Sequence, residues 1–240
     1  MGARLNTVAV AIVCKTPMPG RSKTRLSPPL RLDECAAISA CFIRDLTATI
    51  AELAEDGDVT GYALYTPHGS EAALRLLLPR GLDLLLQGEG DLGARLLQGT
   101  VDLLARGHAG AILVNSDSPT LPKAILREAA DAVRRGDNVT LSPAVDGGYT
   151  LIGLSRPRAR LFADIPWSTE AVYQLTLDRA RELGLSVLNV PAWYDVDDAA
   201  SFAMLEAELA GTPPSFATLA GAPAPATRQF VRARNAALAV

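Results

Sequence analysis

The chain has 240 residues, of which 49% are hydrophobic, 20% are charged and 5% are aromatic. This length fits one large α/β domain or at most two small ones, and the apolar share is enough for a sizeable core. The formal net charge of -3 argues against a nucleic-acid-binding protein, which usually carries a strong basic excess. It leaves room for a small phosphorylated ligand, because a local basic patch can lie on an acidic protein.

Cysteine usage and hydropathy narrow the class of protein further. The three cysteines lack CxxC spacing and fall inside strand-like or helical patterns: Cys14, Cys35 and Cys41. We expect reduced core thiols and a cytoplasmic protein. The apolar stretch at residues 8–14 is too short to cross a membrane and no other run is longer, so we expect no membrane span.

Strand-like and helical patterns alternate along most of the chain. Apolar, β-branched runs predict strands at 8–14, 59–65, 82–86, 111–115, 139–144, 149–154 and 186–190. Helical periodicity and capping signals predict helices at 33–53, 71–78, 91–106, 122–135, 168–183 and 198–209. Ser168 is the expected N-cap of the fifth of these helices. The glycines between 139–144 and 149–154 predict a hairpin or a sharp crossover.

This alternation predicts an α/β fold, in which helices cover both faces of a mostly parallel sheet. We assign residues 1–210 to that domain. Residues 211–240 are rich in Pro and Ala and show no clear period, which predicts a loosely packed C-terminal tail. Ligands of such sheets bind beyond the carboxyl ends of the strands, so the candidate functional segments are those that follow strands.

A basic loop follows the first predicted strand. Its sequence, KTPMPGRSKTRL, contains four cations and no acid: Lys15, Arg21, Lys23 and Arg25. Four such cations repel one another unless an anion bridges them, and phosphate oxygens suit both arginine and lysine. Pro19 stiffens the loop, and Gly20 lets the backbone approach a ligand closely. A solvated loop is the alternative, but the position after a buried strand favours a phosphate site.

A glycine-rich segment, QGEGDLGAR, follows the third predicted strand. The backbone N–H groups around Gly90 can face a base or a phosphate at the start of a helix, and Arg95 lies one turn inside that helix. An ordinary turn with Asp91 as N-cap explains the segment equally well. Neither this segment nor the basic loop has the spacing of a Walker loop or of a dinucleotide fingerprint.

Carboxylates follow two further strands. Asp117 comes directly after the strand at 111–115, where a carboxylate can hold Mg²⁺ or Mn²⁺ against a diphosphate. Asp195 and Asp197 are two residues apart, so in an extended chain both point to one side. Each of the three also suits a turn or a helix cap. Together, opposite the basic loop, they predict a divalent-metal site.

The acceptor side of a reaction is predicted around a second glycine-containing turn. Asp146 in that turn can bind a hydroxyl group or act as a base, and the only histidines, His68 and His108, are far apart, which disfavours a zinc site or a Ser-His-Asp triad. A partly buried core tryptophan is the commoner role for Trp167. We nevertheless expect six residues to contact the acceptor or a sugar: Gly147, Gly148, Trp167, Ser168, Thr169 and Glu170.

Six stretches, in order along residues 8–209, carry a family resemblance: KTPMPGRSKTRL, QGEGDLGARL, VNSDSPTLP, SPAVDGGYTLIGL, IPWSTE and YDVDDAASF. They resemble the rSAM/selenodomain-associated transferase 1 family, small transferases also described as arsenosugar-biosynthesis-type glycosyltransferases. The resemblance implies a Rossmann-like GT-A domain, a three-layer α/β/α sandwich, that binds a nucleoside diphosphate sugar with Mg²⁺ or Mn²⁺. It implies phosphate binding by Lys15, Lys23 and Arg25, and metal binding by Asp117 with Asp195 or Asp197.

Three functions remain open at this point. The first is a glycosyltransferase, in which Lys23 stabilises the leaving diphosphate and Asp146 orients or deprotonates a small-molecule acceptor. The second is a nucleotidylyltransferase acting on a nucleoside triphosphate and releasing pyrophosphate. The loop at Lys23–Leu26 is similar to the Lys-x-Arg-Leu loop of 2-phospholactate guanylyltransferases and, more distantly, to the enzymes that attach GMP to molybdopterin. The third is a non-catalytic nucleotide-binding module.

Two departures and one open point accompany these alternatives. The sequence lacks the G-x-G-x-R opening of many sugar nucleotidylyltransferases, and it has Asp117-Ser118-Pro119 where many glycosyltransferases have Asp-x-Asp. The expected partners are a nucleotide sugar or nucleoside triphosphate and an acceptor, with no nucleic acid. The Leu and Ala content is compatible with a homodimer, but no segment locates an interface.

Overall fold

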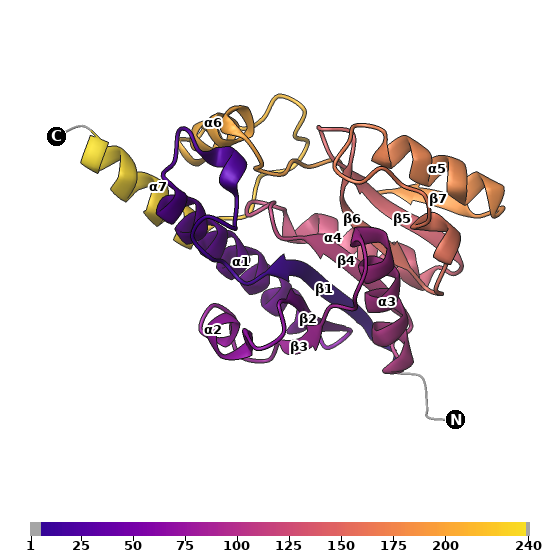
Figure 1. The fold of residues 1–240 in the computed structure, drawn as a ribbon. Helices are drawn as coiled ribbons and strands as arrows, with labels where there is room; N and C mark the ends of the chain where they lie inside the picture. Colours follow the sequence, from indigo (N-terminus) through magenta and orange to yellow (C-terminus); the bar gives the residue numbers. More distant parts are fainter. Residues whose placement is uncertain (1–5, 239–240) are drawn as a thin grey trace.

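The structure, a computed structural model, describes residues 6–238. Its centre is a seven-stranded sheet with the strand order β3-β2-β1-β4-β6-β5-β7 (Figure 1). The strands are β1 (Val8–Lys15), β2 (Val59–Thr66), β3 (Asp83–Leu86), β4 (Gly110–Asn115), β5 (Asn138–Pro143), β6 (Tyr149–Leu154) and β7 (Ser186–Asn189). β6 runs antiparallel to β4 and β5, and the other neighbours are parallel. The predicted α/β class with a mostly parallel sheet is confirmed.

Helices cover both faces of this sheet. They are α1 (Leu32–Ala54), α2 (Glu71–Arg75), α3 (Leu92–Ala105), α4 (Lys123–Arg134), α5 (Val172–Glu182), α6 (Ala199–Leu209) and α7 (Pro225–Leu238), with short 3₁₀ turns η1 (Thr24–Leu26) and η2 (Ala159–Leu161). One core cluster joins the sheet to α1, α4, α6 and α7. The other joins it to α3, η2 and α5. The fold therefore has the expected three layers.

The central strand β1 is apolar on both faces because each face packs against a different part of the core. Val8, Val10 and Ile12 belong to one core cluster, whereas Ala9 and Ala11 belong to the other, as the alternation of side chains along a strand requires. β1 pairs in parallel with β2 and β4 on its two sides. Because Lys15 ends the strand, the basic loop begins at the carboxyl edge of the sheet.

β5 and β6 form the hairpin that the sequence left open as a hairpin or a crossover. The two strands pair antiparallel, and the turn is closed by hydrogen bonds from the Ala144 N–H to the Gly148 carbonyl (3.0 Å) and from the Gly147 N–H to the Ala144 carbonyl (3.2 Å). Since β5 ends where β4 ends and β6 starts there, the turn reaches the same edge of the sheet as the basic loop.

The C-terminal segment differs from the expected loosely packed tail, and that expectation is wrong for residues 225–238. Helix α7 packs along α1 (Figure 1), with Val231 in the core. The buried carboxylate of Asp45 on α1 accepts hydrogen bonds from the N–H groups of Ala226 (2.9 Å) and Thr227 (2.8 Å). This carboxylate satisfies donors at the start of α7 that have no partner inside the helix. The boundary at residue 210 stays a prediction.

The expected N-cap at Ser168 is also wrong. α5 begins at Val172, its N-cap position is Ala171, and Ser168 has a left-handed backbone with φ 65°. The physical reason is a tertiary contact: the N–H of Tyr173 donates to the carbonyl of Gly147 (2.9 Å). The hairpin turn thus holds the start of α5, and residues 166–171 form a loop instead of a first helical turn.

The cysteines and the helix lengths agree with the sequence-based expectations. Cys14, Cys35 and Cys41 are buried and unpaired, and burial, with the charge of Asp117, raises the pKa of Cys14 to about 12. Among the helices of residues 6–238, none is long and apolar enough to cross a membrane.

Candidate functional site

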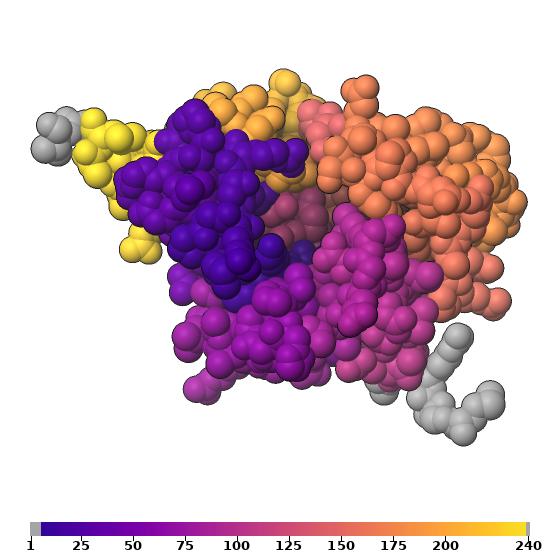
Figure 2. Space-filling view, in the orientation of Figure 1, coloured from indigo at the N-terminus to yellow at the C-terminus, as the bar shows by residue number. Residues whose placement is uncertain are grey.

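Three connected cavities lie at the carboxyl edge of the sheet. Figure 2 shows the hollow between the N-terminal part of the chain (indigo), α3 (magenta) and the segment before α5 (orange). The central cavity, of about 270 Å³, lies between α3, the ends of β1 and β4, the start of β6 and residues 167–169. The basic pocket, of about 340 Å³, lies against the basic loop. The outer pocket, of about 380 Å³, lies between residues 168–170 and residues 194–204.

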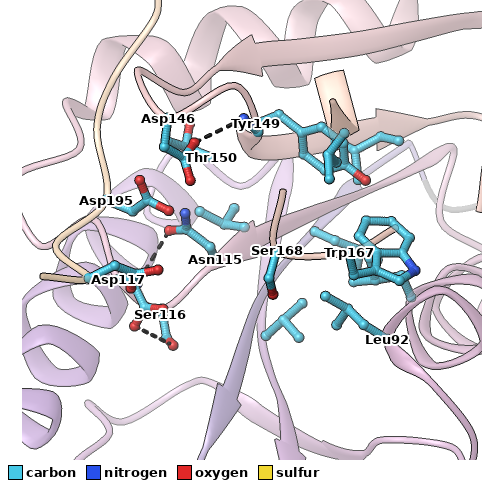
Figure 3. Close-up of a pocket in the computed structure, with 18 of the residues that line it drawn as sticks. Leu92, Asn115, Ser116, Asp117, Asp146, Tyr149, Thr150, Trp167, Ser168 and Asp195 are labelled. Carbon is cyan, nitrogen blue, oxygen red and sulfur yellow. Dashed lines mark hydrogen bonds between the residues drawn. The ribbon is translucent and has the colours of Figure 1, made fainter. Parts of the chain in front are cut away.

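Four carboxylates from three segments line the central cavity: Asp117, Asp146, Asp195 and Asp197. Asp117 follows β4, and Asp146 lies in the hairpin turn (Figure 3). The N–H of Val196 donates to the carbonyl of Asp117 (2.8 Å), and Val196 is fully buried. The two flanking aspartates therefore both line the cavity, as the spacing of two residues predicted.

Asp195 lies among other carboxylates and forms no ion pair within residues 6–238. Burial, together with the negative charges of Asp146, Asp197 and Asp117, raises the pKa of Asp195 to about 7. The nearby cations Lys23 and Arg25 pair instead with Asp117 and Asp197. This end of the cavity therefore favours a positive charge.

Lys23 is buried between the carboxylates, with 8% of its side chain exposed. Its Nζ donates to Asp197 Oδ1 (2.5 Å) and to the Val196 carbonyl (2.8 Å), and lies 2.8 Å from Asp117 Oδ1. Burial alone lowers the pKa of Lys23, but the charges of Asp117 and Asp197 outweigh it and raise that pKa above its usual value. The ammonium group therefore stays charged, and its three N–H donors all have acceptors in the protein.

The basic pocket contains the other cations of the loop. Lys15 and Arg21 are exposed and line it, together with Arg25, whose Nη2 lies 2.5 Å from Asp197 Oδ2. Asp117 and Asp197 line the basic pocket as well as the central cavity. Cations and carboxylates thus line the same pocket. The spacing of these residues along the chain did not show that they pair with one another.

Pro19 and Gly20 form a turn and do not line either cavity. The carbonyl of Met18 accepts hydrogen bonds from the N–H groups of Arg21 (3.0 Å) and Ser22 (3.1 Å), and Gly20 has φ 71°. A positive φ is readily adopted by glycine. The two residues therefore shape the loop that presents the cations, and their proposed contact with a nucleotide stays a prediction.

Gly90 and Arg95 also lie outside the three cavities. Asp91 caps α3 by accepting the N–H of Ala94 (2.8 Å), which is the ordinary-turn alternative. Arg95 Nη1 donates to Gln87 Oε1 (3.1 Å). Gln87 in turn donates from Nε2 to the carbonyls of Cys14 in β1 and Leu64 in β2. Arg95 therefore contacts a side chain that links these two strands.

The predicted acceptor residues form two touching segments. A Cβ built on Gly147, where φ is 89°, would lie 2.3 Å from the Glu170 carbonyl oxygen. Ser168 and Thr169 line the central cavity, Glu170 lines the outer pocket, and Gly148 lines the central cavity beside Asp146. Figure 3 shows Ser168 and Trp167 on the side of the cavity facing the carboxylates. The two segments therefore face one cavity.

The apolar wall of the central cavity was missed by sequence reasoning. It is built from strand and helix side chains: Val13, Leu92, Leu96, Leu113 and Ile152. Four polar residues were also missed: Asn115, Ser116, Tyr149 and Thr150. The spacing of Leu92 and Leu96 by four residues places both on one face of α3. That signal becomes usable only once the start of α3 is known to lie beside the cavity.

No group of three or more His, Cys, Asp and Glu side chains within residues 6–238 is arranged to hold a metal ion as it stands. The positions of the ammonium and guanidinium groups give a physical reason. Lys23 lies between Asp117 and Asp197, and Arg25 takes the second oxygen of Asp197. Cations of the chain itself therefore occupy the space between the carboxylates.

Comparisons with known proteins agree with this fold. The family model named "Uncharacterized protein conserved in bacteria (DUF2064)" matches residues 49–169, about half of the chain. A solved structure from Desulfovibrio desulfuricans G20, provisionally named a nucleotide-diphospho-sugar transferase, has 26% identity and a TM-score of 0.79, with 95% of each chain covered. No curated protein matches the sequence.

More distant solved structures share the fold alone. A 4-diphosphocytidyl-2C-methyl-D-erythritol synthase from Anaerococcus prevotii has 8% identity and a TM-score of 0.56, covering 85% of this chain and 99% of its own. A cytidylyltransferase from Leptospira borgpetersenii has 11% identity and a TM-score of 0.55, covering 97% and 95%. The fold is thus one that nucleotide-sugar transferases and nucleotidylyltransferases use.

Proposed function

The chain belongs to the DUF2064 family, and we propose that it is a transferase that uses a nucleoside diphosphate sugar as donor together with a divalent metal. One observation carries this proposal: Asp117 and Asp197 line both the basic pocket and the carboxylate-lined central cavity. A diphosphate needs cations on one side and a metal held by carboxylates on the other. The likeness to the Desulfovibrio protein supports the sugar donor, and the six motifs support membership of the rSAM/selenodomain-associated transferases 1.

In this proposal the basic pocket binds the diphosphate. Lys15 and Arg21 are exposed there, and Arg25 keeps 66% of its side chain exposed despite its ion pair with Asp197. Arginine binds phosphate oxygens in a bidentate manner and lysine acts as a point charge. The hydroxyl groups of Ser22, Thr24, Ser39 and Ser116 line the same pocket.

The metal is proposed to bind Asp117, Asp195 and Asp197. Carboxylate oxygens are the ligands that Mg²⁺ and Mn²⁺ prefer. The fit of a cation is supported by the ammonium group of Lys23, which lies between two of these carboxylates, and by Asp195, whose own charge is uncompensated. A divalent ion, when bound, neutralises negative charge on the departing diphosphate.

In the proposed reaction, the donor and the acceptor meet in the central cavity, which Asp146 lines. The bond between the anomeric carbon of the sugar and the β-phosphate oxygen breaks, and the acceptor forms a new bond to that carbon. Asp146 uses Oδ1 to accept the Gly148 N–H (2.9 Å), which fixes the carboxylate in the turn. Its other oxygen orients the acceptor hydroxyl and receives its proton. Ser168, Thr169 and Glu170 hold the sugar or the acceptor.

A nucleotidylyltransferase is the second candidate. It is favoured by the placement of the Lys23–Leu26 segment, which forms η1 directly beside Asp117 and Asp197. In that reaction the phosphate of the acceptor forms a bond to the α-phosphorus, the nucleoside monophosphate group is transferred, and pyrophosphate leaves. The same cations would stabilise the charge on the transferred group.

Product analysis separates the two reactions. The protein is incubated with Mg²⁺ or Mn²⁺ and panels of nucleoside diphosphate sugars and nucleoside triphosphates, and the phosphorus products are identified. A released nucleoside diphosphate supports sugar transfer, and released pyrophosphate supports nucleotidyl transfer. Metal-dependent binding of nucleotide sugars, measured by calorimetry, accompanies the assay because it needs no acceptor. Tight nucleotide binding whose affinity changes neither on adding the metal nor on the substitution Asp117→Asn would contradict both reactions.

A matched control separates the metal site from general charge effects. Asp83 is an exposed carboxylate at the start of β3, at the opposite edge of the sheet. Asp83→Asn removes the same charge as Asp117→Asn or Asp195→Asn. We expect metal-dependent binding to be lost in the latter two variants and kept in the control.

A further inference from the structure

We propose that Lys23 is a built-in counter-cation of the metal site, which a divalent ion displaces and which then binds the phosphates in the basic pocket. The inference rests on the proposed function and adds the order of events at the same site. Lys23 stands in for the metal when no metal is bound, and its release couples metal binding to nucleotide binding.

The first support is the geometry of the ammonium group. Nζ lies 2.8 Å from Asp117 Oδ1 and 2.5 Å from Asp197 Oδ1, and it also donates to the Val196 carbonyl (2.8 Å). An ion bridging those two carboxylates has to occupy the same space. A doubly charged ion and an ammonium group repel each other strongly at such separations. The two cations therefore exclude each other.

The second support is that a destination for the ammonium group lies next to its present position. Lys23 lines the basic pocket together with Lys15, Arg21 and Arg25. Its backbone is in the left-handed region, with φ 51°, and non-glycine residues held there are commonly found at switch regions. Lysine has a flexible four-carbon stem, so in this proposal the side chain rotates and turns Nζ from the carboxylates toward the pocket that Lys23 already lines.

The third support is the charge balance. Without a divalent ion, two cations serve the three carboxylates proposed to bind the metal, because Lys23 and Arg25 pair with Asp117 and Asp197 while Asp195 forms no ion pair within residues 6–238. A divalent ion in place of the ammonium group supplies the additional charge. The freed ammonium group then adds a positive charge to the pocket that receives the diphosphate, so each ligand favours the other.

The test measures Mn²⁺ affinity without any nucleotide, by calorimetry or by the electron paramagnetic resonance of free Mn²⁺. Lys23→Met removes the competing cation. An ammonium group that occupies the site nine-tenths of the time weakens the apparent affinity about tenfold, so we expect Lys23→Met to bind Mn²⁺ about tenfold tighter than the wild type. In Lys23→Met, Mn²⁺ should increase the affinity for a nucleoside diphosphate by a smaller factor than in the wild type, because the freed ammonium group no longer adds to the direct effect of the ion.

Two matched variants separate competition from a general charge effect. Lys15→Met removes a charge from the same pocket without touching a carboxylate, and Lys123→Met removes one from the exposed start of α4. Both should keep the wild-type Mn²⁺ affinity within about twofold. The inference is overturned if Lys23→Met binds Mn²⁺ no tighter than these two. If the wild-type protein nevertheless releases a nucleoside diphosphate from a nucleotide sugar, only the displacement of Lys23 is refuted and the proposed function stands.

A measurement on the wild type avoids any folding defect of the variant. Lys23 is buried and paired, so amine-labelling reagents should modify it slowly, and mass spectrometry can follow Lys23 and the exposed Lys123 in one sample. We expect saturating Mg²⁺ to increase the labelling rate of Lys23 several-fold, and an added nucleoside diphosphate to lower it again. A Lys23 rate that does not respond to Mg²⁺, under conditions where the ion is bound, contradicts the exchange.

Discussion

The backbone of Gly147 contacts the backbone of Glu170 so closely that no other residue fits at position 147. A Cβ built there would lie 2.3 Å from the Glu170 carbonyl oxygen, and φ at Gly147 is 89°. This contact joins the β5–β6 turn, which carries Asp146, to the loop before α5, which carries Ser168 and Thr169. The mutual position of the two acceptor-side segments depends on it.

Gly147→Ala should therefore destabilise the fold and misplace Asp146. Strain at such a position costs about 1–3 kcal/mol, and the steric clash should bring the loss to the upper end of that range in denaturant unfolding. Gly184→Ala is the control, because Gly184 has φ 64° but open space around its Cα. An equal loss of unfolding free energy in both variants would show that the contact with Glu170 is unimportant.

Asp45→Ala should loosen α7 from α1. The carboxylate of Asp45 is buried and accepts two backbone N–H groups at the start of α7, and the loss of a helix cap costs about 0.5–2 kcal/mol. Hydrogen exchange should show faster opening of α7 along with the lower stability. Glu52→Ala, at an exposed position of α1, should change stability by less than about 0.5 kcal/mol. If the hydrogen-exchange rates of α7 are the same in Asp45→Ala as in the wild type, Asp45 does not hold α7 against α1.

The buried His108 predicts a specific acid sensitivity. It lies between the Thr7 and Tyr62 hydroxyl groups, and burial, with the charge of Arg106, lowers its pKa below 6.5. The unfolded chain therefore binds the proton more readily, and the stability from neutral His108 is present above that value and is lost as the pH falls below it.

The measurement for His108 is the free energy of unfolding at about pH 7.5 and about pH 5.5, on either side of the ordinary histidine pKa. We expect the wild type to lose more stability on acidification than His108→Gln, which has no titrating group there. His68→Gln should behave as the wild type, because His68 is exposed. If the unfolding free energies of the wild type and of His108→Gln depend on pH in the same way, a neutral His108 does not contribute to the acid sensitivity.

Arg21→Ala should weaken nucleoside diphosphate binding. A hydrogen bond to a charged group contributes about 1.5–3 kcal/mol, which corresponds to a loss of roughly tenfold or more in affinity. Arg21 has no structural ion pair among those found within residues 6–238, so the fold should be unaffected. Calorimetry with the wild type, Arg21→Ala and the distant Lys123→Ala tests this, and equal affinities in all three would place the phosphates elsewhere.

The elements that the sequence predicted correctly are those with a local signal. β1 is apolar on both faces because both of its faces are buried, and Asp91 caps α3 as its position before that helix suggested. α7 was missed because its short pattern, rich in Ala and Arg, becomes a helix through its packing on α1 and its cap from Asp45. That cap comes from a residue 181 positions away, which periodicity cannot show.

The candidate site was predictable as a set of segments and not as a set of contacts. The strand ends led to Lys15, Asp117 and Asp195, which line the cavities at the carboxyl edge of the sheet, and their roles in binding stay predictions. The position of Lys23 was not predictable, because a basic loop in a sequence shows its charge and not its partners. Gly90 and Arg95 are predicted to bind a nucleotide, which stays a prediction, and the hydrogen bond from Arg95 to Gln87 is a contact visible only in three dimensions.

The ion pair between Lys23 and Asp197 joins residues that are 174 positions apart. The cations of the site all precede residue 26, whereas the four carboxylates all follow residue 116. No short stretch of the chain therefore contains a charge-balanced site, and the pockets form only when these distant segments lie together. A ligand that binds only the folded state stabilises the whole domain against unfolding. The free energy of unfolding of this protein should therefore increase with the fraction of sites that are occupied.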